Sequence, residues 1–519
     1  MTLGRVDVTS KIALFGAMAA MAAGVLTGGI NSVRAADEKP LRVAMNADPD
    51  VLDMTQSTNP PQGLATLTNV YEGLWAFNAD GSKRPGLVET YDVSPDGKRI
   101  TLHLRHGVKF QSGDPFTSKD VLWSHQRMLK KTWFYGGFAR FIDHMEAPDD
   151  FTVRVVMKQV DAQFLAIPAL IVASKTYYDR VGEKEFAAHP VGTGPYRIVA
   201  YKPAQYLDLA AWDGYWDKQP AIRKAHFVFV SDDNTRVTKL QAGEVDMIMA
   251  TPYAAYEQLK NAGYTLVKLP VHPTQSVQMS LINKHTPWAD VRVRQAMAYA
   301  IDKNAIAKGL LHGVPTDYPR LMPEELGYDP SLKDYKYDPA KARRLAQEAG
   351  YPNGFDMPLY VSTGVYFGTQ ETAEAVALYL KQNLNVNTKI QGIQLIQLLQ
   401  LIGRMAKDPK GEYVSIAGLP VANLPTPLEG VSLAYYGKAP FALNHDDAMD
   451  ALYEKADATL DLPTQGALIA KMMEIEQNVL QTITLWQYVD VYAMRKGVTY
   501  RPIRHGLEVV YLPEVRVAM

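Results

Sequence analysis

The sequence predicts an α/β fold in which one lobe is interrupted by another. Segments typical of strands alternate with segments typical of helices along most of the chain, which favours α/β packing. The pattern changes near Thr251, and apolar strand-like segments return after Leu480. The chain has 519 residues and is 47% hydrophobic. At ~150 residues per domain, this length allows two to four domains with substantial cores.

The first 35 residues are predicted to form a secretory signal. Arg5 and Lys11 precede an apolar stretch over residues 12–25, and small residues surround Ala35. This is the pattern of a cleavable export segment. A helix over that stretch spans only ~21 Å, too short for a ~30 Å hydrocarbon core. We therefore expect cleavage after Ala35 and a soluble protein in the Gram-negative periplasm.

The first half of the mature chain is predicted to be rich in strands. Alternating or continuous apolar patterns predict strands at residues 42–47, 99–105, 151–157, 225–230 and 245–249. Helices are predicted at residues 64–74, 121–129 and 236–242. The run Ser94–Lys98 is typical of a hairpin turn, and Thr117 with Asp120 marks the start of the second helix.

Longer helices are predicted in the second half. They cover residues 291–308, 339–349, 370–383, 446–460 and 464–480, and strands are expected at 357–361, 485–494 and 507–511. Asp446 and Asp447 beside His445 have the chemistry to bind a cation. Because acids at a helix start stabilise its positive end, we interpret them as a helix cap.

Composition excludes several function classes. The absence of cysteine excludes disulfides, thiolate zinc sites and cysteine nucleophiles. The 54 basic and 55 acidic residues leave no positive field for nucleic acid. His103 and His106 are three apart on a predicted strand, so they point to opposite faces and cannot share a metal ion. We predict no resident metal, no cofactor and no nucleic-acid partner.

No catalytic motif stands out. The sequence contains no G-x-S-x-G, H-E-x-x-H or G-x-x-x-x-G-K-[ST]. Gly192 and Gly194 lack the third glycine of a dinucleotide loop, and Pro195 follows at once. We predict a binding protein rather than an enzyme, with an exported hydrolase or a periplasmic chaperone as the competing classes. The aromatic residues favour a cleft for a small organic ligand.

Several segments together carry a family resemblance. In chain order they are Arg84–Glu89, Ser94–Lys98, Leu104–Phe110, Gly113–Val121, Pro190–Tyr196, Trp212–Trp216, Leu240–Asp246, Arg292–Lys303, Tyr337–Ala342 and Ala349–Phe355. This order resembles the extracytoplasmic solute-binding proteins of family 5, which serve peptide- and nickel-type ABC importers. They include dipeptide- and oligopeptide-binding proteins. The resemblance spans nearly the whole mature chain.

The resemblance implies a large, two-lobed, class II periplasmic binding protein fold with a hinge. The first lobe would comprise residues 36–250 and 485–519, with a subdomain inserted at about 75–185, and the second lobe residues 251–484. By resemblance, a monomer captures a peptide or peptide-like solute by lobe closure and delivers it to an ABC permease and ATPase complex at the inner membrane. Gly192 and Gly194 are expected to adopt backbone angles that other residues avoid.

One departure from the family pattern concerns the solute. Peptide-binding relatives hold the α-amino group with an aspartate, but the corresponding segment, residues 414–425, contains no acid. A buried ammonium needs a compensating charge. Other acids, such as Asp53 or Glu429, could supply it, but nothing in the sequence singles them out. The departure also favours alternatives to simple peptides: modified peptides, opine-like conjugates, oligosaccharides or metal chelates.

The ligand-binding residues are predicted from their positions along the family pattern. Polar contacts are expected from loop residues and stacking from aromatic rings. The predicted set is Gln56, Ser57, Thr58, Tyr253, Tyr366, Gly418, Asn423 and Trp486.

Overall fold

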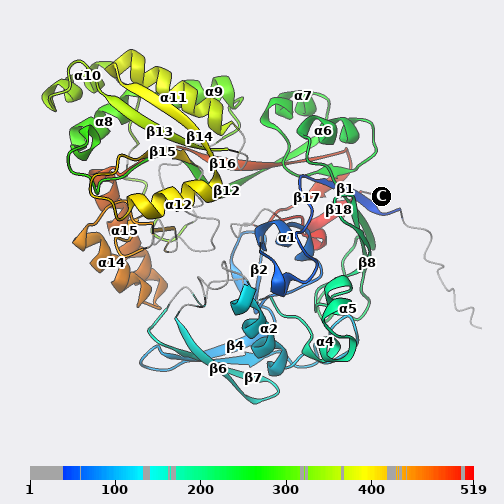
Figure 1. The fold of residues 1–519 in the computed structure, drawn as a ribbon. Helices are drawn as coiled ribbons and strands as arrows, with labels where there is room; N and C mark the ends of the chain where they lie inside the picture. The colour runs from blue at the N-terminus through cyan, green and yellow to red at the C-terminus, as the bar shows by residue number, and fades with distance from the viewer. Residues whose placement is uncertain are drawn as a thin grey trace, which may run out of the picture. The chain divides into compact units, whose positions relative to one another are not determined.

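A computed structural model describes most of the chain after residue 38. The described residues are 39–58, 60–131, 139, 141–161, 164, 171–315, 321, 325–332, 334–363, 368–417, 428, 430–431, 435–439, 441–503 and 509–518. Residues 39–519 form one compact unit, which is described here (Figure 1). In these ranges, no helix combines the length and the apolar character that a membrane span requires.

A mixed sheet of ten strands runs through the described unit. Its order is β14–β13–β15–β12–β16–β11–β1–β10–β9–β8. The strands are β1 (Leu41–Met45), β8 (Tyr196–Lys202), β9 (Tyr206–Ala211), β10 (Lys224–Phe229), β11 (Met247–Ile248), β12 (Thr265–Met279), β13 (Asp356–Thr363), β14 (Asn387–Gln394), β15 (Val414–Ala417) and β16 (Thr482–Met494).

Two hydrophobic cores meet along the central strands of this sheet. The first core draws on β1, β8, β9 and β10, and the second on β13, β15 and the helices that cover them. The long strands β12 and β16 pair antiparallel and contribute buried side chains to both cores. Every residue of β16 is buried, including the polar residues Thr484, Gln487 and Asp490.

The first core also contains a smaller antiparallel sheet. Its order is β4–β5–β7–β6, formed by Val88–Val93, Arg99–Leu104, Thr152–Met157 and Ile142–Asp149 respectively. The turn at Ser94 closes the predicted hairpin, since Gly97 N–H donates to Ser94 O at 2.8 Å. The remaining elements here are α1 (Pro60–Leu67), η1 (Met54–Gln56), β2 (Trp75–Phe77), β3 (Lys83–Pro85), α2 (Ser118–Lys131), α4 (Lys175–Val181), α5 (Glu183–Ala188) and α6 (Asp233–Gln241).

Helices cover both faces of the second part of the sheet. Helices α8, α10 and α11 pack against one another, and α11 and α12 pack on β13 and β14 (Figure 1). These helices are α8 (Val291–Ala300), α10 (Pro339–Glu348), α11 (Thr369–Leu384) and α12 (Leu395–Met405). The other helices after residue 250 are α7 (Tyr256–Asn261), α9 (Lys303–Leu310), α14 (Asp447–Asp457) and α15 (Leu462–Val479), with 3-10 turns η3 (Tyr253–Ala255) and η4 (Pro287–Ala289). Helices α14 and α15 pack against each other in a separate apolar cluster.

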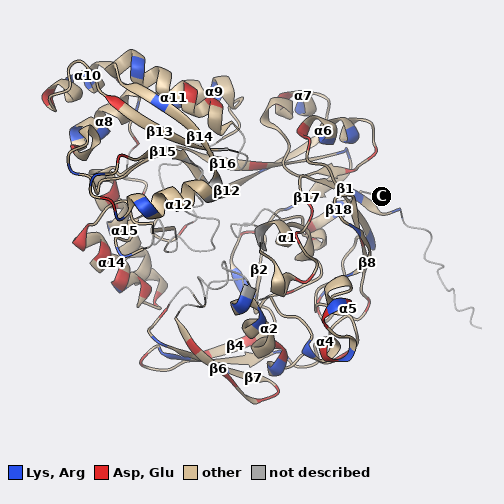
Figure 2. Ribbon diagram, in the orientation of Figure 1, with Lys and Arg blue, Asp and Glu red and all other residues tan. Residues whose placement is uncertain are grey.

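Charged residues occur on helices, strands and loops alike, and acidic residues gather on α14 (Figure 2). Asp446 is the N-cap of α14 and accepts a hydrogen bond from Met449 N–H at 3.0 Å. The prediction that Asp446 caps a helix is therefore confirmed.

Three predicted elements differ in the structure. The helix predicted at 291–308 is two helices, because Asp302 caps α9 by accepting from Ala305 N–H at 2.9 Å. The helix predicted at 64–74 begins at Pro60 and ends at Leu67, since Gly73 forms a β-bridge with Ile171. Residues 509–511 form no strand, because Val510 N–H donates to Ala65 O of α1.

The C-terminal strands pair with each other instead. They are β17 (Val498–Tyr500) and β18 (Val515–Val517), and η5 (Leu512–Glu514) precedes β18.

The expected role of Gly192 and Gly194 is wrong. Neither glycine has a positive φ. A Cβ atom on Gly192 would lie 2.1 Å from Val70 O, and one on Gly194 would lie 2.7 Å from the same oxygen. Glycine is required at these positions because two backbone segments approach closely, not because of an unusual backbone angle.

Candidate functional site

The crossing between the two cores occurs on β12 and β16. Near one end of the pair, Leu269 and Tyr492 pack in the first core, and near the other end Val277 and Ile483 pack in the second. The antiparallel register shifts between Pro270 and Thr274 and again between Gln275 and Ser276. Such irregularities bend a strand and redirect its side chains. At the first end β16 also contributes Val489 and Val491 to the second core. The bend therefore lies between a stretch that both cores share and a stretch that packs in the second core.

Buried polar side chains gather at this bend. Gln275 is directly opposite Trp486 in the register, and Tyr488 is two residues further along β16, so the three side chains share one face of the sheet. The Tyr488 hydroxyl donates to Gln275 Oε1. It also lies 3.3 Å from the hydroxyl of Thr369, the first residue of α11. We call Gln275, Trp486, Tyr488 and Thr369 the crossing patch.

Two N–H donors in the crossing patch have no acceptor among the described residues. They are Gln275 Nε2 and Trp486 Nε1, on side chains of residues only 0% and 2% exposed. A buried donor without an acceptor costs about 1–3 kcal/mol. A solute that presents a carboxylate or carbonyl oxygen would satisfy both donors. The crossing patch is therefore chemically suited to bind an acceptor group.

The predicted ligand residues have different surroundings. Trp486 belongs to the crossing patch. The Tyr253 hydroxyl instead donates to Val489 O at 2.9 Å and accepts from Val489 N–H at 3.1 Å, so it fastens η3 to β16. Tyr366, Gly418 and Asn423 lie outside the described residues.

The three predicted loop residues follow η1 or end it. Ser57 is buried and donates to Asp50 Oδ1 at 2.7 Å, whereas Thr58 is exposed and donates its N–H to Asp50 Oδ2 at 2.7 Å. The Gln56 amide is half-buried and donates to Thr55 O at 2.8 Å. Asp50 and local backbone contacts thus hold the loop in a defined conformation.

Asp53 is unsuited to replace the missing amino-group aspartate. Its carboxylate accepts from the Thr55 hydroxyl at 2.6 Å and from the Arg127 guanidinium at 2.7 Å. Arg127 also stacks over the rings of Trp123 and Tyr178, at 4.9 and 4.7 Å. The carboxylate is therefore already compensated by a cation held in place by two rings. The other candidate, Glu429, lies outside the described residues.

Sequence reasoning missed a second embedded carboxylate, Glu72. It accepts from Trp216 Nε1 at 2.8 Å and from the Tyr215 hydroxyl at 2.9 Å. Burial raises the pKa of Glu72 to about 7 despite these bonds. The adjacent Tyr215 and Trp216 were the available signal, because the hydroxyl of a buried tyrosine and the N–H of a buried tryptophan need a hydrogen-bond partner.

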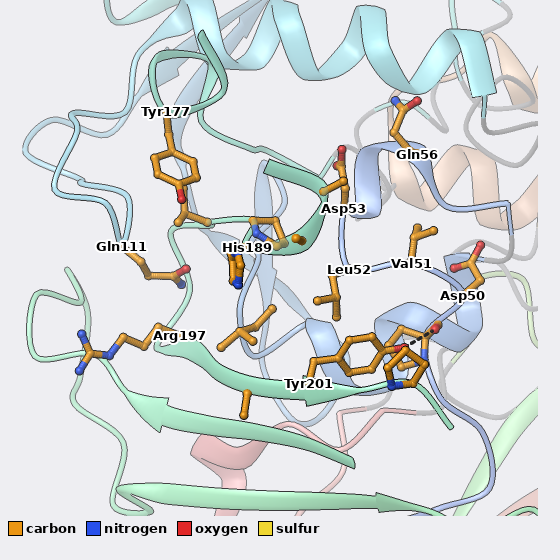
Figure 3. Close-up of a pocket in the computed structure, with 18 of the residues that line it drawn as sticks. Asp50, Val51, Leu52, Asp53, Gln56, Gln111, Tyr177, His189, Arg197 and Tyr201 are labelled. Carbon is orange, nitrogen blue, oxygen red and sulfur yellow. Dashed lines mark hydrogen bonds between the residues drawn. The ribbon is translucent and has the colours of Figure 1, made fainter. Parts of the chain in front are cut away.

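A cavity of about 760 Å³ lies beside the loop that carries Asp53 (Figure 3). Its lining residues all fall between positions 48 and 203, so they belong to the first core's part of the chain and none comes from β12 or β16. The lining comprises residues 48–53, 56, 111, 127, 177, 183, 187–191, 197–201 and 203. This cavity is therefore separate from the crossing patch.

The two histidines that the sequence places on one predicted strand have separate surroundings. His103 Nε2 lies 2.8 Å from Asp92 Oδ2, and His106 stacks on Phe151 with ring centroids 3.9 Å apart. No group of three or more potential metal-ligating side chains occurs in the described part of the chain.

Comparison with known proteins identifies the family. Residues 83–438 match the family model for bacterial extracellular solute-binding proteins, family 5 Middle. The glutathione-binding protein GsiB of Pectobacterium atrosepticum is 35% identical over 361 residues, which cover 67% of each chain. GsiB of Shigella flexneri is 33% identical over 359 residues, again 67% of each chain.

Solved structures share the two-lobed α/β fold. HbpA2 from Haemophilus parasuis superposes with a TM-score of 0.82 at 23% identity, over 93% of this chain and 100% of HbpA2. AgaA from A. tumefaciens R10, solved with agropinic acid, gives a TM-score of 0.71 at 25% identity, over 93% and 99% of the two chains. The chain therefore belongs to family 5 of the bacterial extracellular solute-binding proteins, which supplies substrate-binding components of ABC importers.

Proposed function

We propose that the protein captures a peptide-like solute that carries a free carboxylate, and that glutathione is the first compound to test. The observation that carries this proposal is the pair of buried N–H donors, Gln275 Nε2 and Trp486 Nε1, which lack acceptors among the described residues. The 35% identity to a glutathione-binding protein supports the choice of solute. A carboxylate at the crossing patch would accept from both donors, and hydrogen bonds to charged acceptors are the stronger ones.

The missing aspartate is consistent with this solute. The glutamyl residue of glutathione is linked through its side chain, so its α-amino and α-carboxylate groups stay on one carbon. The ammonium therefore brings its own counter-charge and needs no acid from residues 414–425. Strand β15 ends at Ala417, which pairs with Ser276 next to Gln275. The segment without an acid thus begins beside the crossing patch.

The proposed mechanism is capture by closure of two lobes, residues 36–250 with 485–519 and residues 251–484, about β12 and β16. The solute favours the closed form only to the extent that it binds that form more tightly. The closed protein would then deliver its solute to a membrane permease whose ATPases supply the energy. We further propose that residues 1–35 direct export to the periplasm, and that the protein acts there as a monomer without catalysing a reaction.

Isothermal titration with reduced glutathione tests the proposal. We expect saturable binding by the purified protein, weakened about tenfold in Trp486→Phe because one hydrogen bond to a charged group is lost. Trp288→Phe is the matched control, since the Trp288 indole already donates to Ser280 O at 3.0 Å. This control should lose stability but keep its affinity.

Two outcomes would contradict the proposal. One is the absence of glutathione binding, especially if agropinic acid, an oligosaccharide or a nickel chelate binds instead. The other is an unchanged affinity in Trp486→Phe, which would mean that the solute does not use the crossing patch.

A further inference from the structure

Strand β8 forms one border of the cavity in Figure 3, and it is the last strand of the ten-stranded sheet. At the start of β8, the backbone groups on its outer edge already have hydrogen-bond partners. Tyr196 N–H donates to Asn69 O at 2.9 Å, and Tyr196 O accepts from Gln111 Nε2 at 2.8 Å. Between Arg197 and Tyr201, the described residues provide no backbone partner other than β9. The register with β9 shifts between Ile198 and Ala200, so Val199 is the extra residue of a β-bulge on this edge.

An open strand edge of this kind is a template for another extended chain. Alternate N–H and C=O groups along a strand point away from its neighbour, and an added strand satisfies them. Val199 on β8 is 62% exposed, which leaves apolar surface beside these groups. In Figure 3 the cavity side chains lie along β8 on the side opposite the following strands. The cavity therefore offers both room and backbone hydrogen-bonding groups.

The two ends of this edge differ in charge. Arg197 is exposed and forms no ion pair within the described residues. At the other end, Asp48 Oδ2 accepts from Ala204 N–H at 2.9 Å and lies 3.4 Å from the Tyr201 hydroxyl. No described cation pairs with Asp48. Burial, followed by the charges of Asp48 and Asp50, raises the pKa of Tyr201 to about 12, which agrees with a negative end.

The distance between the two charged ends of the β8 edge limits the length of a peptide that can bind there. Arg197 and Tyr201 are four residues apart on β8, or at most about 13 Å at ~3.3 Å per residue, because the bulge at Val199 bends the strand between them. An extended peptide covers a similar ~3.3–3.6 Å per residue. Three or four residues therefore fill the edge between the cationic and the anionic end. Leu52 and Val199 offer apolar surface to the side chains of such a ligand.

We propose that the cavity and the free edge of β8 form a second binding site, which takes a zwitterionic peptide of three or four residues as an added strand. The amino group lies at Asp48 and the carboxylate at Arg197, so the peptide runs antiparallel to β8. No lining residue comes from β12 or β16. The second site is therefore independent of the crossing patch and of the proposed glutathione binding.

Hydrogen–deuterium exchange of the purified protein with tetra-alanine tests this site. We expect the peptide to slow exchange in residues 196–203, because the added strand protects amides of β8. Arg197→Glu should raise the peptide concentration needed for protection about tenfold, since reversal of the charge replaces an attraction by a repulsion. Arg99→Glu is the matched control, because Arg99 is an exposed arginine on β5, away from the cavity lining. Tetra-alanine blocked at both ends should protect weakly or not at all.

Three results would overturn the proposal. The first is no protection of residues 196–203 at millimolar tetra-alanine. The second is protection confined to β12 and β16, which would place the peptide at the crossing patch only. The third is equal protection by the blocked peptide or in Arg197→Glu, which would exclude recognition of a zwitterion. The two variants separate the sites, because Trp486 lies outside the cavity lining and Arg197 lies within it. Glutathione binding lost in Trp486→Phe but kept in Arg197→Glu reports on the crossing patch, so failure of one site does not mask the other.

Discussion

The crossing patch and the loop around Asp53 both contain buried polar groups. They differ in whether those groups have hydrogen-bond partners. In the loop, the Asp53 carboxylate has a cation and two Thr55 donors as partners. In the crossing patch, Gln275 Nε2 and Trp486 Nε1 have no acceptor among the described residues. Satisfied buried groups stabilise a fold, whereas unsatisfied ones are a cost that a ligand can remove. The comparison separates structural residues from candidate binding residues.

The largest expected effect on stability comes from removing the ion pair between Asp53 and Arg127. Arg127→Ala removes the cation and leaves the carboxylate of Asp53, a residue only 2% exposed, buried without its counter-charge. We expect a loss of about 3–5 kcal/mol in the free energy of unfolding, measured by urea denaturation. In the double variant Asp53→Asn with Arg127→Met, the loss should be smaller. A single-variant loss below about 1 kcal/mol would contradict the structural role of the pair.

A sharper comparison uses two of the predicted ligand residues, Tyr253, which contacts strand β16, and Trp486, which lies on it. Tyr253→Phe leaves the backbone N–H and C=O of Val489 without their shared partner, so we expect the protein to lose about 1–2 kcal/mol of stability. Trp486→Phe removes a donor that has no acceptor among the residues that the structure describes, so stability should hold or rise. Thermal and urea denaturation of both variants measures the difference. An equal loss of stability in both variants would show that the Tyr253 hydroxyl and the Trp486 indole play the same role.

The smallest expected effect concerns pH. The pKa of Glu72 is raised from 4.5 to about 7 in the folded protein. The folded state therefore holds this proton more tightly, and its contribution to stability is present below about pH 4.5 and is lost as the pH rises through 7. We expect Glu72→Gln to reduce this loss by on the order of 1 kcal/mol. The measurement is urea denaturation between pH 5 and pH 8.

The profile of the Glu72→Gln variant should not become flat. Burial also raises the pKa of Asp490 on β16 to about 6, so part of the decline remains. An unchanged pH profile in Glu72→Gln would show that Glu72 does not titrate in this range.

Local sequence patterns predicted many features of individual elements. The cap at Asp446 and the hairpin turn at Ser94 depend on residues within a few positions of each other, so their signals are readable from the chain. The break at Asp302 was also a local signal, but the apolar periodicity of residues 291–308 obscured it. The family resemblance supplied the two-lobed arrangement, which no local pattern contains.

The partners of buried groups could not be predicted from the sequence. Gly192 is a glycine because Val70 O approaches its Cα, and nothing near Gly192 in the chain reports that approach. Tyr253 and Trp486 were equal candidates in the sequence. In the structure the Tyr253 hydroxyl is hydrogen-bonded to Val489, whereas the Trp486 indole N–H has no partner among the described residues. The cavity beside β8 likewise depends on the edge position of that strand, which is a property of the whole sheet.

The sequence by itself determined the family, the alternation of strands and helices, and the absence of cysteine chemistry. The tertiary structure decided which polar groups are satisfied and which are available to a solute. Gln275 and Tyr488 are 213 positions apart in the chain and bonded in the fold. Hydrogen bonding and burial act over a few ångströms in space, whereas sequence patterns report only on neighbours along the chain.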